Sequence, residues 1–270
     1  MNLNRILILN DFSEASKKSV QYGLQLAKSL EASTWIQHVY YIPPDLAGQV
    51  VISQEALKNY EKSIYQQFDS VKSELGIGED THFVVNHGDL IKEMNQLIDK
   101  ETIDLVVVGN HGGGFWTNIL GSNTVKIIQH AHCPVLSVPE EATFKPFQQI
   151  AFAADLKDTS PEVLIQLVNF AQTFQAHVDV IHVSDKTSRD SKEEFGMLEQ
   201  MLHPVSHTFY YAWEKDIEEG ILEHVKERQN DLLVLVPRVH PFFDRLFQKS
   251  ISQQMVYHSK VPLLSIHEYE

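Results

Sequence analysis

The sequence predicts an α/β protein made of two copies of one domain, each a five-stranded parallel sheet with helices on both faces. The first observation behind this prediction is that four segments of the first half recur, in the same order, in the second half. They are Ile6–Asp11 with Ile150–Asp155, Gln37–Val39 with Ile181–Val183, Asp104–Gly109 with Asp231–Val236, and Cys133–Ser137 with Val261–Ser265. The second observation is that short apolar runs alternate with segments of helical periodicity, as expected of parallel strands linked by helices.

The spacing of these repeats indicates where the two domains divide. The offset is 144 residues for the first two segments and 127 or 128 for the last two, so about 16 residues are missing from the middle of the second copy. The chain has 270 residues, which is the length of two ordinary domains. Phe144–Phe147 fits a linker best, and this predicts a first domain over residues 1–143 and a second over 148–270.

In the first copy, short apolar runs predict five strands. These are Ile6–Asn10, Ser33–Tyr41, His82–Asn86, Leu105–Val108 and Pro134–Val138. Four helices are predicted between them. The first is capped by Ser13, the next two are Ser53–Leu75 and Leu90–Lys100, and the last runs from near Ser122 to His130.

The second copy repeats this order, with strands near residues 150–154, 178–183, 208–212, 232–236 and 262–266. Its missing residues fall within 184–204, where the charge run Asp185–Glu194 predicts a solvated loop or a frayed, shortened helix. The last strands of the two copies, Pro134–Val138 and Pro262–Ile266, are apolar edge strands. We expect these edges to pair with each other and to join the halves as an intramolecular pseudo-dimer.

The composition limits the function and the location of the protein. Its formal net charge of −14 argues against a nucleic-acid partner, whose phosphates require a basic face. The single cysteine, Cys133, heads an apolar strand, which predicts a buried thiol and a reducing compartment. The sequence shows no signal segment and no apolar run of the roughly 18 residues that a membrane span needs. We therefore expect a soluble, cytoplasmic protein without a membrane partner.

The residues that carry chemistry follow the first and fourth strands of the first copy, at the sheet edge where doubly wound folds bind ligands. Asp11 follows the first strand, and the glycine-rich segment Gly109–Thr124 follows the fourth and leads into a helix. Glycines let backbone N–H groups approach a phosphate, and a helix N-terminus adds unpaired donors. Ser122 and Thr124 add hydroxyl groups there. The segment therefore predicts a phosphate cradle, with Asp11 placed to accept hydrogen bonds from a ribose.

These residues make the chain similar to a tandem universal stress protein, with two such domains covering essentially its whole length. The nucleotide-binding members of that family carry G-x2-G-x9-G-(S/T) after the fourth strand, an aspartate after the first, and a valine that contacts adenine. The matching residues here are Gly109, Gly112, Gly121, Ser122, Asp11 and Val39. One departure is that eight residues, 113–120, separate Gly112 from Gly121, where the family has nine.

The resemblance implies a Rossmann-like fold of the adenine-nucleotide alpha-hydrolase-like type. It also implies that the ligand is ATP or a related adenine nucleotide, with no metal beyond a magnesium ion carried by the nucleotide. The predicted binding residues are Asn10, Asp11, Val39, Gly109, His111, Gly112, Gly121, Ser122, Asn123 and Thr124.

The second copy has lost the phosphate cradle. Pro237 replaces the glycine at the end of the fourth strand, and Lys249-Ser250 stands where Gly121-Ser122 does. We therefore expect nucleotide in the first domain only. The expected protein is a stress-response or signalling module rather than an enzyme, with at most slow ATP hydrolysis, because no carboxylate or lysine placed for phosphoryl transfer is visible.

Two other functions fit the same residues. If Gly109–Thr124 is a tight connection without a ligand, the protein is an interaction module whose output is partner binding. If His111 is a general base rather than an ordinary loop residue, the protein is a nucleotide-cleaving enzyme.

A metal site and a homodimer are weaker alternatives. His130, His132 and Cys133 are zinc-ligand types, but neighbouring positions at a helix end point in diverging directions, so no metal site is predicted. The aromatic pairs Phe115-Trp116 and Phe242-Phe243 would provide apolar surface through which two chains associate as a homodimer.

Overall fold

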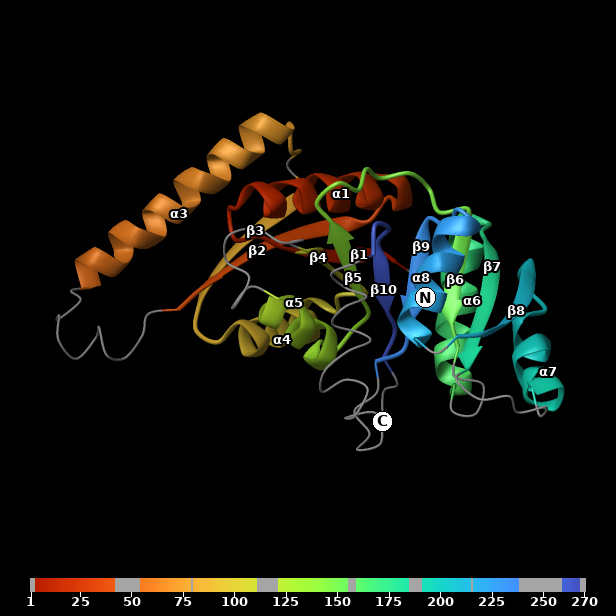
Figure 1. Ribbon diagram of the computed structural model, residues 1–270. Helices are drawn as coiled ribbons and strands as arrows, with labels where there is room; N and C mark the ends of the chain where they lie inside the picture. The colour runs from red at the N-terminus through yellow and green to blue at the C-terminus, as the bar shows by residue number, and fades with distance from the viewer. Residues whose placement is uncertain are drawn as a thin grey trace.

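The computed structural model describes residues 3–41, 54–78, 80–110, 121–154, 159–184, 191–214, 216–237 and 259–267. Within these residues the chain forms one ten-stranded sheet with helices on both of its faces (Figure 1). The repeated α/β architecture predicted from the sequence is confirmed. No helix in the described part of the chain is long and apolar enough to cross a membrane.

The elements of the first half alternate as predicted, and their ends differ from the prediction by a residue or two. They are β1 (Arg5–Leu9), α1 (Glu14–Leu30), β2 (Ser33–Tyr40), α3 (Gln54–Leu75), β3 (Thr81–His87), α4 (Leu90–Glu101), β4 (Leu105–Asn110), α5 (Gly121–His130) and β5 (Val135–Pro139). Ser13 is the N-cap of α1, as predicted, and its hydroxyl oxygen accepts a hydrogen bond from the Ser16 N–H.

The second half repeats the pattern. Its elements are β6 (Gln149–Ala153), α6 (Pro161–Phe174), β7 (His177–Ser184), α7 (Ser191–Leu202), β8 (His207–Trp213), α8 (Ile217–Glu227), β9 (Leu232–Leu235) and β10 (Leu263–Ser265). Because α7 begins at Ser191, the end of the charge run is helical, whereas residues 185–190 lie outside the described part of the chain.

The two halves share one sheet. The strands lie in the order β3-β2-β1-β4-β5-β10-β9-β6-β7-β8. Neighbouring strands are parallel within each half, whereas β5 and β10 are antiparallel, with Leu264 opposite Leu136. This pairing satisfies the backbone groups of two edges without a second molecule. It confirms the predicted intramolecular pseudo-dimer.

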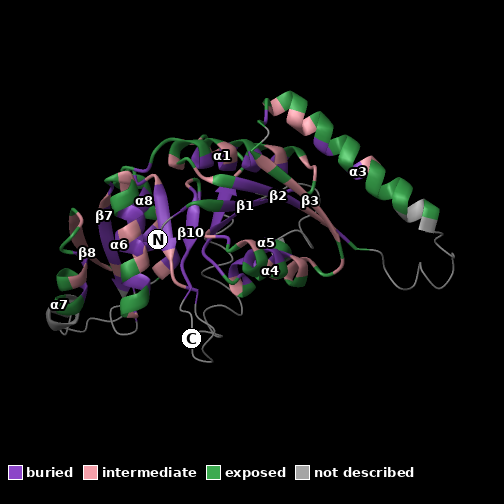
Figure 2. Ribbon diagram, turned by 180° about the vertical axis from the view of Figure 1, so that it is seen from behind, coloured by how far each residue is buried: buried purple, intermediate pink, exposed green. Residues whose placement is uncertain are grey.

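The sheet separates two hydrophobic cores. Helices α1, α3, α6 and α7 cover one face, and α4, α5 and α8 cover the other. The first core is continuous across both halves, because it includes Leu136 of β5 and Leu264 of β10. Figure 2 shows the buried strands between helices whose outer sides are exposed, and α3 extending beyond the sheet.

The predicted linker is part of this core. Phe147 is 1% exposed, and its ring lies 5.7 Å from that of Phe170 and 5.0 Å from that of Phe174, both on α6. Phe144 packs edge-on against Tyr22 of α1, with 5.3 Å between ring centroids. Burial raises the pKa of Tyr22. The segment between the domains therefore ties α1 of the first half to α6 of the second.

The structure explains why an aspartate recurs before the fourth strand of each half. The Asp104 carboxylate accepts hydrogen bonds from the backbone N–H groups of Asn4 (2.8 Å) and Arg5 (2.9 Å), where β1 begins. Asp231 does the same at the start of β6, accepting from Gln148 (2.8 Å) and Gln149 (3.2 Å). In both halves this carboxylate therefore satisfies backbone donors at the start of the first strand.

A buried histidine joins the halves beside β10. His267 is 7% exposed, its Nε2 contacts the Ile128 carbonyl oxygen of α5, and its own carbonyl accepts from Gln166 Nε2 of α6 (3.3 Å). Burial lowers the pKa of His267 below its ordinary value. The folded protein therefore keeps this ring neutral at a pH where the unfolded chain already binds a proton.

This difference predicts acid sensitivity. Below pH 6.5 the unfolded state takes up a proton that folded His267 resists, so the free energy of unfolding falls as the pH drops, by at most about 1.4 kcal/mol per unit for one group. His267→Gln keeps a side-chain donor but cannot titrate. We expect urea unfolding at pH 7 and pH 5 to show a smaller loss of stability in this variant than in the parent. Equal losses would contradict the assignment.

Candidate functional site

A pocket of about 160 Å³ lies where β1, β2 and β4 end. Its polar lining residues are Asn10, Asp11, Ser16, Gln37, Asn123 and Thr124, and the others are Leu9, Val39, Leu90, Val108, Gly109 and Ile127. Strand β1 has β2 on one side and β4 on the other, so the pocket opens where the strand order reverses. Ligands of open α/β sheets bind at this position.

The structure brings together six of the ten residues predicted to bind nucleotide. They are Asn10, Asp11, Val39, Gly109, Asn123 and Thr124. Gly121 and Ser122 begin α5, the helix that carries Asn123 and Thr124 to the pocket. His111 and Gly112, with the rest of residues 111–120, lie outside the described part of the chain.

The turn after β1 fixes the position of Asp11. Phe12 has a φ of +63°, a left-handed conformation that costs about 1–3 kcal/mol for a bulky residue. Packing holds it there, because its ring lies 4.7 Å from that of His38 and 5.0 Å from that of Phe68. Asp11 Oδ1 accepts hydrogen bonds from Ser13 N (3.0 Å) and Ser13 Oγ (2.6 Å). Asp11 thus stands at the pocket edge and also supports the start of α1.

Gly109 has a packing role beside the pocket. A Cβ at this position would lie 3.1 Å from Ser19 Oγ and 3.5 Å from the Ala15 carbonyl oxygen, so α1 approaches β4 closely here. The Gly109 carbonyl accepts from Thr124 Oγ1 (3.3 Å), which links β4 to the start of α5. A larger residue at position 109 would crowd the Ser19 side chain of α1 and is therefore a poor probe of ligand binding.

His38 has a structural role that both halves share. Its Nδ1 lies 2.8 Å from the Asn10 carbonyl oxygen, so this nitrogen carries the proton and donates. His182 makes the same contact with the Ala154 carbonyl at 3.0 Å. The histidine that precedes each repeated valine thus holds the end of the neighbouring strand.

Sequence analysis missed Gln37, a 1% exposed residue of β2 that lines the pocket. The signal was available, because Ile181 occupies the matching position of the second half, so the repeat has an apolar residue where the first half has Gln37. The same comparison pairs Asn10 with Ala154 and Gly109 with Val236, so Val236 rather than Pro237 replaces the glycine, and Pro237 matches Asn110. The second half therefore has apolar residues at the positions of Asn10 and Gln37, whereas Ser160 keeps the hydroxyl of Ser16.

The zinc-ligand types near β5 do not converge. Burial raises the pKa of the Cys133 thiol, as expected for the predicted buried cysteine, whereas the exposed His132 places Nδ1 3.0 Å from Asp99 Oδ1. Among the described residues no group of three histidines, cysteines or carboxylates is placed to hold a metal ion.

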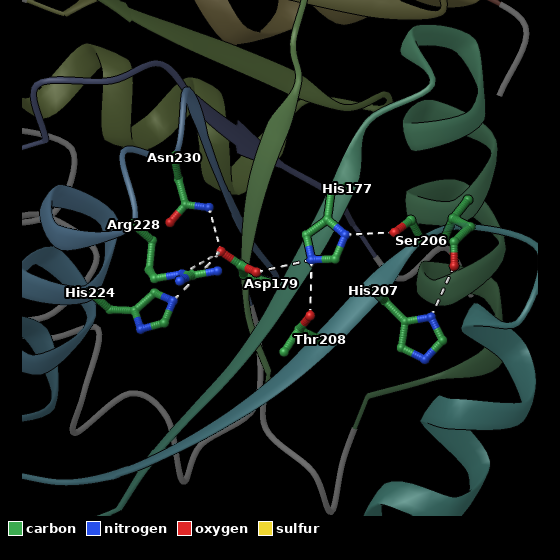
Figure 3. Close-up of polar contacts among 9 residues, drawn as sticks. His177, Asp179, Ser206, His207, Thr208, His224, Arg228 and Asn230 are labelled. Carbon is green, nitrogen blue, oxygen red and sulfur yellow. Dashed lines mark hydrogen bonds and ion pairs between the residues drawn. The ribbon is translucent and has the colours of Figure 1, made fainter.

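Sequence analysis also missed a polar cluster in the second half, centred on Asp179 (Figure 3). Asp179 is fully buried, and its carboxylate accepts a hydrogen bond from Asn230 Nδ2 at 2.9 Å. His177 Nε2 lies at 3.3 Å, Arg228 Nε at 3.7 Å and His224 Nε2 at 3.8 Å. These contacts join β7 to α8 and to Asn230, which lies between α8 and β9.

The fold and the site define a tandem α/β protein with a pocket at a strand crossover, and comparison with known proteins gives its family. The universal stress protein family profile matches residues 2–139 and again 146–267. The chain belongs to the universal stress protein family.

Similar proteins agree with this assignment. A universal stress protein of Methanocaldococcus jannaschii is 27% identical over 139 residues, covering 50% of this chain and 81% of its own. Universal stress protein A of Escherichia coli is 29% identical over 143 residues, covering 52% of this chain and 96% of its own. The crystal structure of a universal stress protein from Archaeoglobus fulgidus matches all of this chain and 98% of its own, with a TM-score of 0.75 at 16% identity, which supports the tandem fold.

Proposed function

We propose that this protein is a stress-response or signalling module that binds ATP or a related adenine nucleotide in its first half only. The observation that carries the proposal is the pocket at the ends of β1, β2 and β4, which gathers the residues that match the family motif and are described. Where the first half has Asn10, Gln37 and Gly109 in this pocket, the second half has Ala154, Ile181 and Val236.

The chemistry of the pocket suits a nucleotide. Helix α5 starts beside it, and the N–H groups of a helix N-terminus favour phosphate. Asp11 stands at the edge, where a carboxylate accepts hydrogen bonds from ribose hydroxyls. Val39, Leu90 and Ile127 supply an apolar surface for a base.

The proposed protein is a binding module rather than an efficient enzyme. Asp11 is the one charged side chain among the described lining residues, and Ser13 and α1 already engage it. Phosphoryl transfer requires cationic groups or metal ions that neutralise developing charge. We therefore expect ATP hydrolysis, if measured, to be slow.

Titration calorimetry with ATP tests the proposal, and we expect one site per chain. Val39→Trp places an indole in a pocket of about 160 Å³ and should weaken binding by about tenfold or more, which is about 1.4 kcal/mol. Ile165→Trp, at an exposed position of α6, is the control in the second half and should leave the affinity unchanged. Two equivalent sites would overturn the restriction to the first half. An absence of binding in the parent protein would overturn the proposed function.

A further inference from the structure

A chain of polar contacts in the second half leads from the protein surface to the buried carboxylate of Asp179 (Figure 3). His177 Nδ1 lies 2.7 Å from Ser206 Oγ, and His177 Nε2 lies 3.3 Å from Asp179 Oδ1. Ser206 is exposed, the His177 side chain is 23% exposed, and Asp179 is fully buried. A hydroxyl, an imidazole and a carboxylate thus follow one another inward from the surface.

The pleat of the sheet brings these side chains together. His177 and Asp179 are two residues apart on β7 and therefore project from the same face. Ser206 and Thr208 have the same spacing at the start of β8, and the parallel register sets Ser206 opposite His177 and Thr208 opposite Asp179. Thr208 Oγ1 lies 3.0 Å from His177 Nε2. The imidazole ring is therefore held between two paired strands.

The surroundings of His177 fix which ring nitrogen carries its proton. Asp179 Oδ1 is buried and, apart from this ion pair, has no partner within the described part of the chain. A carboxylate oxygen only accepts hydrogen bonds, so the proton of the neutral ring belongs on Nε2, which faces it. Nδ1 then carries the lone pair and accepts from the Ser206 hydroxyl. His38 and His182 have the opposite tautomer, because their Nδ1 atoms face carbonyl oxygens.

The fold does not require this arrangement. In the first half the same register places Ser33 at the position of His177 and Asp80 at the position of Ser206. Stacked rings take the place of the buried carboxylate there. Burying a carboxylate costs free energy that packing rings does not, and residues that break the rules of a stable core are typical of functional sites.

We propose that Ser206 is an activated nucleophile for acyl transfer, with His177 as its general base and Asp179 as the residue that positions the imidazole. The substrate class is a carboxylic ester with a good leaving group, such as an aryl ester. Serine hydrolases use the same order of hydroxyl, imidazole and carboxylate with the ring turned over, so that Nε2 faces the serine. The roles follow from this order of groups, and either ring nitrogen can serve as the base.

The reaction balances with groups of the chain and water alone. Ser206 Oγ attacks the ester carbonyl carbon while its proton passes to His177 Nδ1. The bond from that carbon to the leaving oxygen then breaks, and His177 returns the proton to the leaving group. Water next gives a proton to His177 and its oxygen to the acyl carbon, which releases the carboxylic acid, and His177 restores the serine hydroxyl. Because Ser206 is exposed, water surrounds the developing oxyanion, and we expect slow turnover.

A fluorophosphonate probe tests the proposal on the full chain, because activated serines displace its fluoride and keep the phosphonyl group. We expect peptide mass spectrometry to find the label on Ser206 and Ser206→Ala to lose it. His177→Gln keeps a polar side chain without a base and should slow labelling about a hundredfold or more. Ser33→Ala removes an exposed serine at the start of β2 and is the matched control, which should keep the parent rate at Ser206.

Two results of this experiment would overturn the proposal. The first is a parent protein that takes up no label or takes it up only at other residues, and this result does not depend on the stability of any variant. The second is equal labelling of Ser206 in the parent and in folded His177→Gln, which would show that the imidazole does not activate the serine. Hydrolysis of p-nitrophenyl acetate adds a measure of turnover. The parent should exceed Ser206→Ala, and equal rates would contradict acyl transfer through Ser206.

Asp179 acts through His177, so its role has a separate test. Nitrogen NMR of protein with labelled histidines distinguishes Nδ1–H from Nε2–H, and the signal of His177 is the one that His177→Gln removes. We expect Nε2–H in the parent and Nδ1–H in Asp179→Asn. In that variant Asn230 Nδ2 holds the new amide by its oxygen, so the amide N–H groups face His177 Nε2. The same tautomer in both proteins would overturn the positioning role of Asp179.

Discussion

Phe147→Ala is expected to lower the free energy of unfolding by about 3–5 kcal/mol, the cost of truncating a fully buried phenylalanine. Phe147 is 1% exposed and packs against Phe170 and Phe174, so alanine leaves a cavity that α6 alone cannot close. The effect should reach both halves, because the core that contains Phe147 also contains Leu136 and Leu264.

Urea unfolding of the full chain measures this effect. A single transition that shifts as a whole is expected, since one sheet and one continuous core span the halves. Lys145→Ala, two positions away and exposed, is the matched control and should change stability by less than about 0.5 kcal/mol. Two transitions, of which Phe147→Ala shifts only one, would show that the halves unfold independently.

Much of this fold could be predicted because the information is local or repeated. Apolar runs and helical periodicity place the strands and helices, and the duplication leaves two unpaired edges, β5 and β10, that pair with each other. The burial of Phe147 could not be predicted in the same way. Lys145 and Pro146 beside it are typical of an exposed connection, and the rings that enclose it belong to Phe170 and Phe174, more than twenty positions further along the chain.

The candidate site, like the fold, could be predicted from the sequence only in part. The strand ends, the glycine-rich segment and the family resemblance led to Asn10, Asp11, Val39 and Gly109, which the structure gathers around one pocket. Gln37 was missed although the repeat contains it, because a polar residue within a strand is normally assigned to an exposed face. Only the three-dimensional arrangement shows that this position is buried against the pocket.

Asp179 was missed for a related reason, since a carboxylate in a strand suggests solvent, whereas this side chain is fully buried. Its counterpart in the first half is Trp35, whose ring stacks on that of His82 with 5.0 Å between centroids. The first half therefore fills this position with stacked rings instead of a carboxylate. The second half instead encloses a negative charge beside Arg228 and His177 (Figure 3). A buried carboxylate is tolerated only where such partners compensate it.

Asp179→Ala should therefore lower the free energy of unfolding by about 2–4 kcal/mol. The variant leaves Asn230 Nδ2 buried without its acceptor and removes the charge that faces His177 and Arg228. Arg228 is 48% exposed, so water solvates its charge after the loss, and this keeps the effect below that of a fully buried ion pair.

Urea unfolding measures this change. The matched control is Glu223→Ala, which removes an exposed carboxylate from α8. That control should stay within about 0.5 kcal/mol of the parent. If the two variants lose the same small amount of stability, the cluster does not depend on its buried carboxylate. If Asp179→Ala alone is costly, one domain fold has been stabilised in two ways, by stacked rings in the first half and by a compensated charge in the second.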